Sequence, residues 1–288
     1  MTKGEDIMGI RITTDNCCDL SPELLERYQI AVGHLRVRFG EKEYEPGELT
    51  NAEFYHMMST ANELPTTSQP SVEDLVENYT NLLANGDEVI AIHLSSGISG
   101  TVQGANLAAN LINNPRLHVV DSLKASVGEG LLVLEAARMA SEGRSVTEVL
   151  QRLQEMQRNL QCIFFVGNLD ALIKGGRISK ARALIAGALD IKPLLYFNEQ
   201  GQIMPLEKVR GYRKGLRRLV DIMGEMSTSL SEQVVGICHG ADPETAEFLK
   251  QEINQHYHPR EVVIGEIGPV IGAHVGPGTF SVFFNKDA

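Results

Sequence analysis

Strand-like and helix-like segments alternate along nearly the whole chain, and this alternation restricts the possible folds more than any other feature of the sequence. Four short runs rich in Val and Ile fit buried strands, at residues 88–94, 117–121, 162–166 and 234–238. Most of them are followed by Gly, Ser or Asp. Runs of this kind are typical of parallel strands that helices cover on both faces. The pattern therefore predicts an α/β fold.

Helix starts between these strands are marked by capping residues. Ser21 precedes Pro22, which combines an N-cap side chain with a proline at the first helical position. Capping-box spacing, in which Ser or Thr is followed three residues later by Glu or Asp, occurs at Thr50, Ser71 and Ser145. We therefore expect a helix to begin at each of these positions.

The last third of the chain has a different pattern. Residues 193–197 and 203–206 fit the two strands of a hairpin, and strand-like stretches interrupted by glycines fill residues 262–284. A chain of 288 residues is long enough for two domains of ordinary size. We expect an N-terminal three-layer α/β/α domain at residues 9–160 and a C-terminal two-layer α/β domain at residues 161–288.

Charge and hydropathy exclude several classes of protein. The formal net charge of -11 argues against nonspecific binding to nucleic acid or to an anionic membrane. No apolar run approaches the roughly 20 residues that span a bilayer, and the first residues lack the apolar region of a signal peptide. The four cysteines have neither C-x-x-C spacing nor a His-rich metal pattern. We expect a cytoplasmic protein with reduced thiols, no metal site and no membrane insertion.

A loop rich in serine and glycine at residues 95–101 is one of two candidate ligand sites. It follows an expected strand and precedes a helix-like segment. Gly97 and Gly100 allow a ligand to approach the backbone closely, and Ser99 and Thr101 supply donors at the helix start. A plain helix cap with a flexible turn explains the same residues equally well.

The second candidate is the strip Thr66-Thr67-Ser68-Gln69-Pro70. The prolines on either side favour extended backbone and hold the hydroxyl groups in place, although a solvated loop remains an equal alternative. Neither hydroxyl cluster has a base nearby in the sequence. The two loops therefore suit a carboxylate or a phosphate better than they suit a nucleophile.

Other chemistry-bearing residues have two interpretations each. Lys174 and Arg177 flank two glycines, which fits a phosphate site or a glycine break between helices. His274 is surrounded by small residues and fits either a ligand site or simple packing, whereas His93 fits a core histidine. The basic stretch from Arg210 to Arg218 fits a solvated helix face or a docking surface for an acidic partner.

Signs of catalysis are weak. No pair of carboxylates and no Ser-His-Asp order stands out, and the glycine-rich loop matches neither G-x-G-x-x-G nor a Walker A motif. We therefore expect no enzyme. The alternative is a hydrolase or a phosphotransferase that uses Ser96 or Ser99 as its nucleophile.

Six short motifs, in this order, resemble those of the DegV family of bacterial fatty-acid-binding proteins. They are Thr14-Asp15 and residues 67–70, 93–101, 120–122, 174–178 and 273–278. The resemblance extends from about residue 10 to residue 284. One departure is Asn16-Cys17-Cys18, where the family often has Ser or Thr after the first Thr-Asp, so that the role of this loop is open.

This resemblance implies a function. It implies two α/β domains that hold a long-chain fatty acid between them, with the tail in an apolar tunnel. Thr67 and Ser99 would bind the carboxylate, and Arg177 and His274 would belong to the neighbouring polar network. The resemblance also implies that the protein is a carrier without a cofactor, which presents the acid to an ATP-dependent fatty acid kinase for phospholipid synthesis. The sequence does not predict the length or saturation of the acyl chain.

Overall fold

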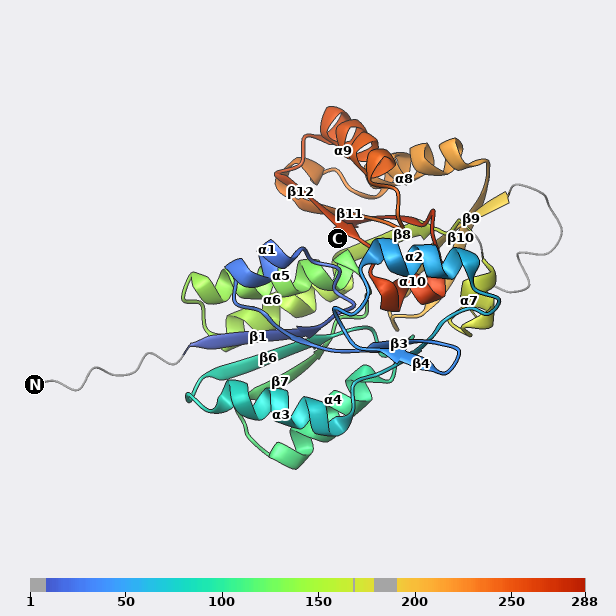
Figure 1. Cartoon of the computed structure of the whole chain (residues 1–288). Helices are drawn as coiled ribbons and strands as arrows, with labels where there is room; N and C mark the ends of the chain where they lie inside the picture. Colours follow the sequence, from blue (N-terminus) through green and yellow to red (C-terminus); the bar gives the residue numbers. More distant parts are fainter. Residues whose placement is uncertain (1–8, 168, 179–190, 288) are drawn as a thin grey trace, which may run out of the picture.

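The strands of the described residues form three sheets. A computed structural model describes residues 9–167, 169–178 and 191–287. Figure 1 shows the two larger sheets one above the other, with helices below, between and above them. The expected α/β fold, built as two α/β units, is confirmed.

The first sheet is parallel and belongs to the N-terminal half. Its order is β2-β1-β6-β7. The strands are β1 (Ile10–Asp15), β2 (Ala31–Gly33), β6 (Glu88–His93) and β7 (Leu117–Asp121). Helices α3 (Val72–Leu83) and α4 (Thr101–Ile112) cover one face, and α5 (Val127–Ser141) with α6 (Val146–Asn159) covers the other (Figure 1). These are the three layers that the sequence predicts.

The second sheet is mixed, in the order β10-β9-β8-β13-β11-β12. Its strands are β8 (Leu160–Phe165), β9 (Ile191–Phe197), β10 (Ile203–Arg210), β11 (Val234–His239), β12 (Glu261–Glu266) and β13 (Phe280–Asn285). Helices α8 (Tyr212–Met226) and α9 (Pro243–Tyr257) cover its outer face. All strands of this sheet begin at or after Leu160; the domain boundary near that residue stays a prediction.

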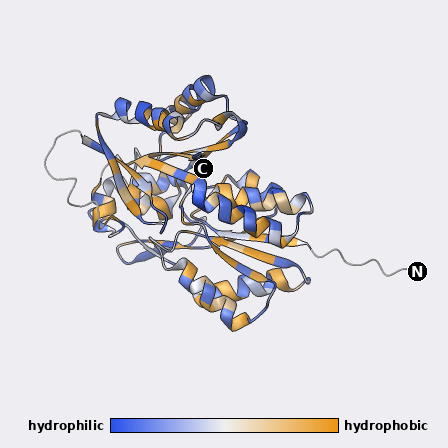
Figure 2. Ribbon diagram, turned by 180° about the vertical axis from the view of Figure 1, so that it is seen from behind, coloured by the Kyte–Doolittle hydropathy of each residue, from blue (hydrophilic) through white to orange (hydrophobic). Residues whose placement is uncertain are grey.

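Helix α5 lies between the two large sheets. Val127, in its first turn, is fully buried and touches two glycines of the second sheet. A Cβ atom would come within 2.7 Å of Val127 at Gly236 and within 2.4 Å at Gly265. These glycines therefore let β11 and β12 approach the helix. Figure 2 shows hydrophobic residues concentrated in the strands and on the helix faces turned toward them.

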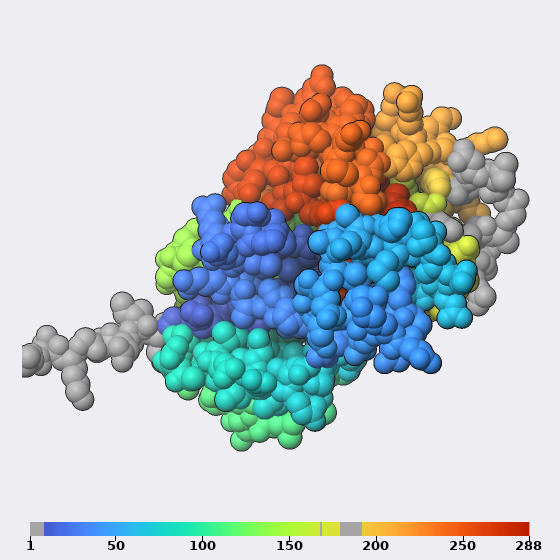
Figure 3. Space-filling view, viewed as in Figure 1, coloured from blue at the N-terminus to red at the C-terminus, as the bar shows by residue number. Residues whose placement is uncertain are grey.

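A small third sheet joins the halves. Its antiparallel order is β4-β3-β5, from β3 (Arg36–Phe39), β4 (Lys42–Tyr44) and β5 (Thr66–Ser68). Helix α2 (Asn51–Thr60) packs against α10 (Pro269–Val275), and the hydroxyl group of Tyr55 donates to the carbonyl oxygen of Ile267 at 3.0 Å. In Figure 3 the blue N-terminal residues lie directly against the orange and red C-terminal ones. The short helices α1 (Pro22–Arg27) and α7 (Asp170–Lys174) complete the elements used below.

Several local predictions are confirmed. The capping boxes at Thr50, Ser71 and Ser145 are all formed, with both reciprocal hydrogen bonds. The side chain of Ser21 accepts from the backbone N–H of Leu24 at the start of α1. The expected hairpin is β9 and β10. Among the described residues, no helix has the length and apolar character needed to cross a membrane.

Two local predictions were wrong. Strand β8 is antiparallel to both neighbours; its continuous apolar run reflects burial on both faces, which does not depend on strand direction. Residues 262–284 contain helix α10, whose sequence of Val, Ile, Gly and Pro has low helix propensity. Thr66–Ser68 has the extended backbone that its flanking prolines favour, and it pairs with β3 as a strand of the third sheet.

Candidate functional site

An apolar cavity lies where the two halves of the chain meet. It contains about 710 Å³ of empty space, counted with the part that opens to solvent. Most of its wall is hydrophobic, including Phe164, Phe197, Ile203, Ile267, Val270 and Phe283. A cavity with such a wall suits a long apolar ligand.

All four residues that the sequence singles out line this cavity. They come from four separate segments of the chain. Thr67 lies in β5, Ser99 precedes α4, Arg177 follows α7, and His274 lies in α10. The fold therefore brings together hydroxyl groups, an imidazole and a cation that are far apart in the sequence.

Thr67 and His274 form a hydrogen-bonded pair. Thr67 Oγ1 is 2.8 Å from His274 Nε2, and the buried His274 Nδ1 has no hydrogen-bond partner among the described residues. The ring packs against Gly175, where a Cβ atom would come within 2.6 Å of Nδ1. Burial, together with the charge of Arg177, lowers the pKa of His274 to about 4. The imidazole is therefore neutral at pH 7, and if Nε2 carries the proton, the Thr67 hydroxyl is free to donate to a ligand.

Ser99 lies directly before helix α4. Its Oγ is 2.9 Å from Thr101 Oγ1 and accepts the backbone N–H of Thr101 at 3.3 Å. The adjacent Gly100 lies so close to Gln69 that a Cβ atom would come within 2.1 Å of the Gln69 Oε1. This contact joins the two hydroxyl-rich loops into one site.

Arg177 supplies the cation. Its Nε donates to the carbonyl oxygen of Ile98 at 3.2 Å, and its Nη1 donates to that of Gly175 at 2.6 Å. No carboxylate of the described residues forms an ion pair with it. The guanidinium is thus held by neutral carbonyl groups and keeps its charge available for an anion.

The Asn16-Cys17-Cys18 loop shapes the cavity wall. The side-chain amide of Asn16 donates to the carbonyl oxygen of Leu35 at 3.0 Å and accepts the N–H of Leu35 at 2.9 Å. Leu35 lines the cavity. Cys17 and Cys18 are buried, as are the other two cysteines, and all four are free. The loop that departs from the family pattern therefore holds a cavity residue in place.

The cavity lining also includes residues with hydroxyl groups that sequence reasoning missed, namely Thr279, Ser281 and Ser126. Ser126 lies directly before α5. Its Oγ donates to Asp19 Oδ2 at 2.5 Å and lies 2.8 Å from Cys238 Sγ, and its backbone has φ +58°. Asp19 also accepts the N–H of Gly268 at 2.9 Å, and burial raises the pKa of this carboxyl group to about 7. No motif marks Ser126, because its partners come from distant parts of the chain.

The structure offers little support for a serine nucleophile. The Ser99 hydroxyl contacts another hydroxyl, and no described His, Asp or Glu side chain forms a hydrogen bond with the side chain of Ser96 or Ser99. His93 lies in the core, as expected, with Nδ1 3.1 Å from Asp15 Oδ2 and Nε2 2.6 Å from the hydroxyl group of Tyr79. Within the described ranges, no three His, Cys, Asp or Glu residues are placed to hold a metal ion.

Comparison with known proteins gives a consistent result. A family model described as "Uncharacterised protein, DegV family" matches residues 9–287. Protein DegV of Bacillus subtilis is 35% identical over 277 residues, which cover 96% of this chain and 98% of that protein.

Solved structures match equally well. One is a DegV family protein from Thermus thermophilus that is described as binding fatty acid. Its structure has a TM-score of 0.91 and 32% sequence identity, and the match covers 97% of this chain and 100% of that one. A stearic acid-binding protein from Eubacterium ventriosum has a TM-score of 0.86 and 26% identity, covering 96% and 98%.

Proposed function

Since the chain belongs to the DegV family, we propose that it binds a long-chain fatty acid between its two halves. The acyl tail occupies the apolar cavity, and the carboxylate lies against the hydroxyl groups of Thr67 and Ser99. One observation carries this proposal. Two hydroxyl groups, a neutral imidazole and a guanidinium from four separate segments all line one apolar cavity.

Affinity comes mainly from the tail. A sixteen-carbon acid buries about 14 methylene groups, and at roughly 0.8 kcal/mol each this supplies about 11 kcal/mol. Immobilising the chain and removing water from the carboxylate cost several kcal/mol of that total. The polar residues therefore have to orient the head group, and they do not have to supply most of the affinity.

The polar network suits a carrier better than an enzyme. Neutral hydroxyl groups hold the carboxylate without attacking it, and Arg177 stabilises its charge. The carboxylate is left chemically intact for a second protein. We propose that this second protein is an ATP-dependent fatty acid kinase, which phosphorylates the bound acid for phospholipid synthesis in the cytoplasm.

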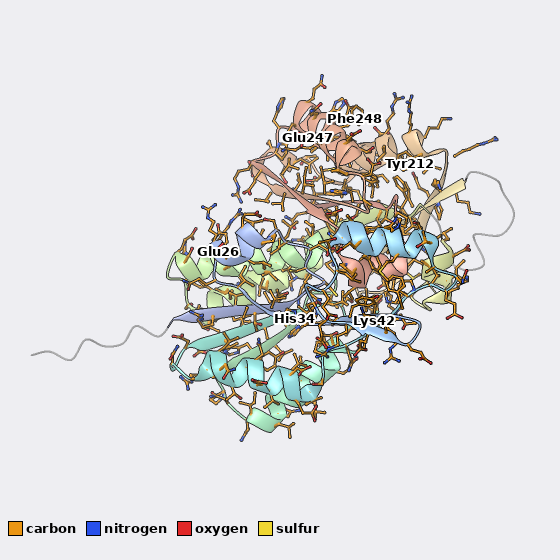
Figure 4. All side chains as sticks on the ribbon, viewed as in Figure 1. Glu26, His34, Lys42, Tyr212, Glu247 and Phe248 are labelled. Carbon is orange, nitrogen blue, oxygen red and sulfur yellow. The ribbon has the colours of Figure 1, made fainter. Side chains whose placement is uncertain are left out.

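The stretch from Arg210, at the end of β10, to Arg218, in α8, is the proposed docking surface for the kinase. Of the five cations between Arg210 and Arg218, Arg218 is paired with Glu207 and Glu225. The other four (Arg210, Arg213, Lys214 and Arg217) are exposed and have no ion pair among the described residues. The neighbouring Phe248 of α9 is 51% exposed, and Figure 4 shows it at the outer surface near Tyr212. A basic face with an exposed aromatic residue suits an acidic partner surface.

Native mass spectrometry of the purified protein tests the binding proposal. Co-purified ligands with the masses of long-chain fatty acids are the expected result. A protein that carries no acyl ligand, does not bind added palmitate and hydrolyses acyl esters would instead favour the alternative, an enzyme with Ser96 or Ser99 as its nucleophile.

A further inference from the structure

One hydroxyl group in the wall of the apolar cavity has no hydrogen-bond partner among the described residues. It belongs to Ser281 of β13, which lines the cavity and is only 5% exposed. The other hydroxyl-bearing side chains of the lining all have partners, and they are Thr67, Ser99, Ser126 and Thr279. A buried hydroxyl group without a partner costs free energy. Ser281 therefore points to a ligand that has a polar group at this place in the cavity.

Ser281 and Ser126 are neighbours on the cavity wall. Cys238 of β11 is directly opposite Ser281 in the sheet, and such residues point to the same face, with Cβ atoms about 5 Å apart. Ser126 Oγ lies 2.8 Å from Cys238 Sγ. Phe283, on the same face of β13 as Ser281, reaches the first turn of α5, where a Cβ atom at Gly128 would come within 2.8 Å of its ring. Ser126 and Ser281 thus form one polar area, here called the serine patch.

The two hydroxyl groups of the serine patch have complementary hydrogen-bonding capacity. Ser126 Oγ donates its only proton to Asp19 Oδ2 at 2.5 Å, so a lone pair of this oxygen can accept a hydrogen bond. Ser281 still has its proton to donate. An alcohol both donates and accepts, and it therefore satisfies both serines. A ketone accepts from Ser281 but has nothing to donate to Ser126, and a methylene group satisfies neither serine.

The backbone and Asp19 hold Ser126 in this position. A serine at a helix N-cap usually accepts an N–H group of its own helix, but the side chain of Ser126 does not cap α5. Its backbone has φ +58°, a conformation that is unfavourable for a residue other than glycine. Asp19 is fixed in turn by the N–H group of Gly268 at 2.9 Å. The fold thus turns this hydroxyl group away from its helix and toward the cavity wall.

The serine patch lies beside the acyl tail, at a distance from the head group. The cavity follows one face of α10, which contributes Val270, Ile271 and His274 to its lining. His274 of the head-group site is in the last turn of α10, whereas Gly268, which binds Asp19, is its N-cap. Six residues of helix rise about 9 Å, which is less than the length of an extended sixteen-carbon chain. The patch therefore faces the interior of a long acyl chain.

We propose that the cavity binds a long-chain fatty acid that carries a hydroxyl group within its chain, with this hydroxyl group held between Ser126 and Ser281. The inference rests on the proposed function and narrows the class of acid. Ser281 donates to the oxygen of the ligand's hydroxyl group, which donates to Ser126 Oγ. In an entirely apolar tunnel, the same hydroxyl group would lose its hydrogen bonds to water and weaken binding.

Calorimetry with a set of octadecanoic acids tests the serine patch. Stearic acid is the reference, and the other acids carry a hydroxyl group on carbon 6, 8, 10 or 12. The keto acid with its carbonyl group at the most tightly bound position completes the set. Binding is measured with the wild type, Ser281→Ala and Ser126→Ala. Ser227→Ala is the control, because Ser227 is as buried as Ser281 but does not line the cavity.

The expected result is a preference that depends on the position of the hydroxyl group. One hydroxy acid should bind the wild type at least about threefold more tightly than stearic acid and than its keto analogue. Acids with the hydroxyl group far from the patch should bind more weakly than stearic acid. Ser281→Ala and Ser126→Ala should each weaken binding of the preferred acid about tenfold, since its hydroxyl group loses a partner. Ser227→Ala should keep the wild-type preference.

The inference is overturned if the wild type binds stearic acid more tightly than every hydroxy acid, or if the preference persists in Ser281→Ala. The second criterion does not depend on the folding of Ser126→Ala. Failure of the proposed function is seen separately, as a wild type that does not bind stearic acid or palmitate. Binding of a hydroxy acid that Ser281→Ala weakens would even then support the serine patch, whereas no binding of any acid would remove both proposals.

Discussion

At the scale of single residues, the proposed function assigns the binding of the head group to Thr67 and Ser99. Thr67→Val keeps the shape of the side chain but removes its hydroxyl group, and Ser99→Ala does the same at the second loop. Each change should weaken palmitate binding by about 1–3 kcal/mol, because one carboxylate lone pair loses its donor. Thr66→Val is a matched control, since Thr66 is exposed on the same strand and does not line the cavity. Wild-type affinity in both single variants would remove these residues from the head-group site.

His274 gives a prediction for pH dependence. Its pKa is about 4 in the folded protein, against an ordinary value of 6.5. Between pH 4 and pH 6.5, His274 is therefore protonated in the unfolded chain and neutral in the folded protein. The free energy of unfolding should therefore fall as the pH is lowered from about 6.5 to about 4, by up to about 3 kcal/mol.

The comparison variant is His274→Asn, which retains a polar side chain but does not titrate. Denaturant unfolding of both proteins across this pH range gives a difference curve. Asp19 contributes with the opposite sign, because its pKa is raised from 3.8 to about 7, but it is present in both proteins and cancels. A flat difference curve would show that His274 titrates normally in the folded state.

At the scale of elements, helix α8 carries the prediction about the kinase. Arg213→Glu reverses one of the exposed cations on its outer face and should slow acyl-phosphate formation by the kinase while palmitate affinity stays unchanged. The loss should decrease with salt, because exposed charges are screened within about 8 Å at physiological ionic strength. Arg158→Glu carries the same charge change on the exposed side of α6. Equal kinase rates for the two variants at low salt would identify the α8 stretch as a solvated helix face only.

The helices and strands also show which parts of the fold could be predicted from the sequence alone. Capping boxes and the hairpin between β9 and β10 depend on neighbouring residues, so their local pattern predicts them. Helix α10 was missed because tertiary contacts stabilise it: Gly272 lies against Phe54, where a Cβ atom would come within 2.7 Å of the ring. His274 lies in the last turn of this helix. The sequence therefore identified His274 as a candidate site residue but did not predict the helix that carries it.

At the scale of the whole molecule, the cavity could not be derived from patterns alone. Thr67, Ser99, Arg177 and His274 were singled out through motifs and through the family resemblance, and the fold brings them together; their contact with a ligand stays a prediction. The wall behind them is built from side chains of both halves, and Ser126 with Asp19 and Cys238 has no sequence signature. Such contacts depend on how α5 lies between the sheets, which no local spacing encodes.

Because both halves form the cavity, a bound fatty acid should stabilise the whole molecule. Ligand at 100 times its Kd adds about 2.7 kcal/mol to the free energy of unfolding. Each added methylene group should strengthen binding by roughly 0.8 kcal/mol while it is buried. At one fixed ligand concentration, the melting temperature should therefore rise along a series of saturated acids from eight carbons upward, then level off when the tail fills the cavity. Thr67→Val should lower the melting temperature for every acid of the series. It should not change the acyl chain length at which the melting temperature levels off, since the head group and the tail contribute separately to binding. A melting temperature that does not depend on chain length would contradict binding of the tail in this cavity.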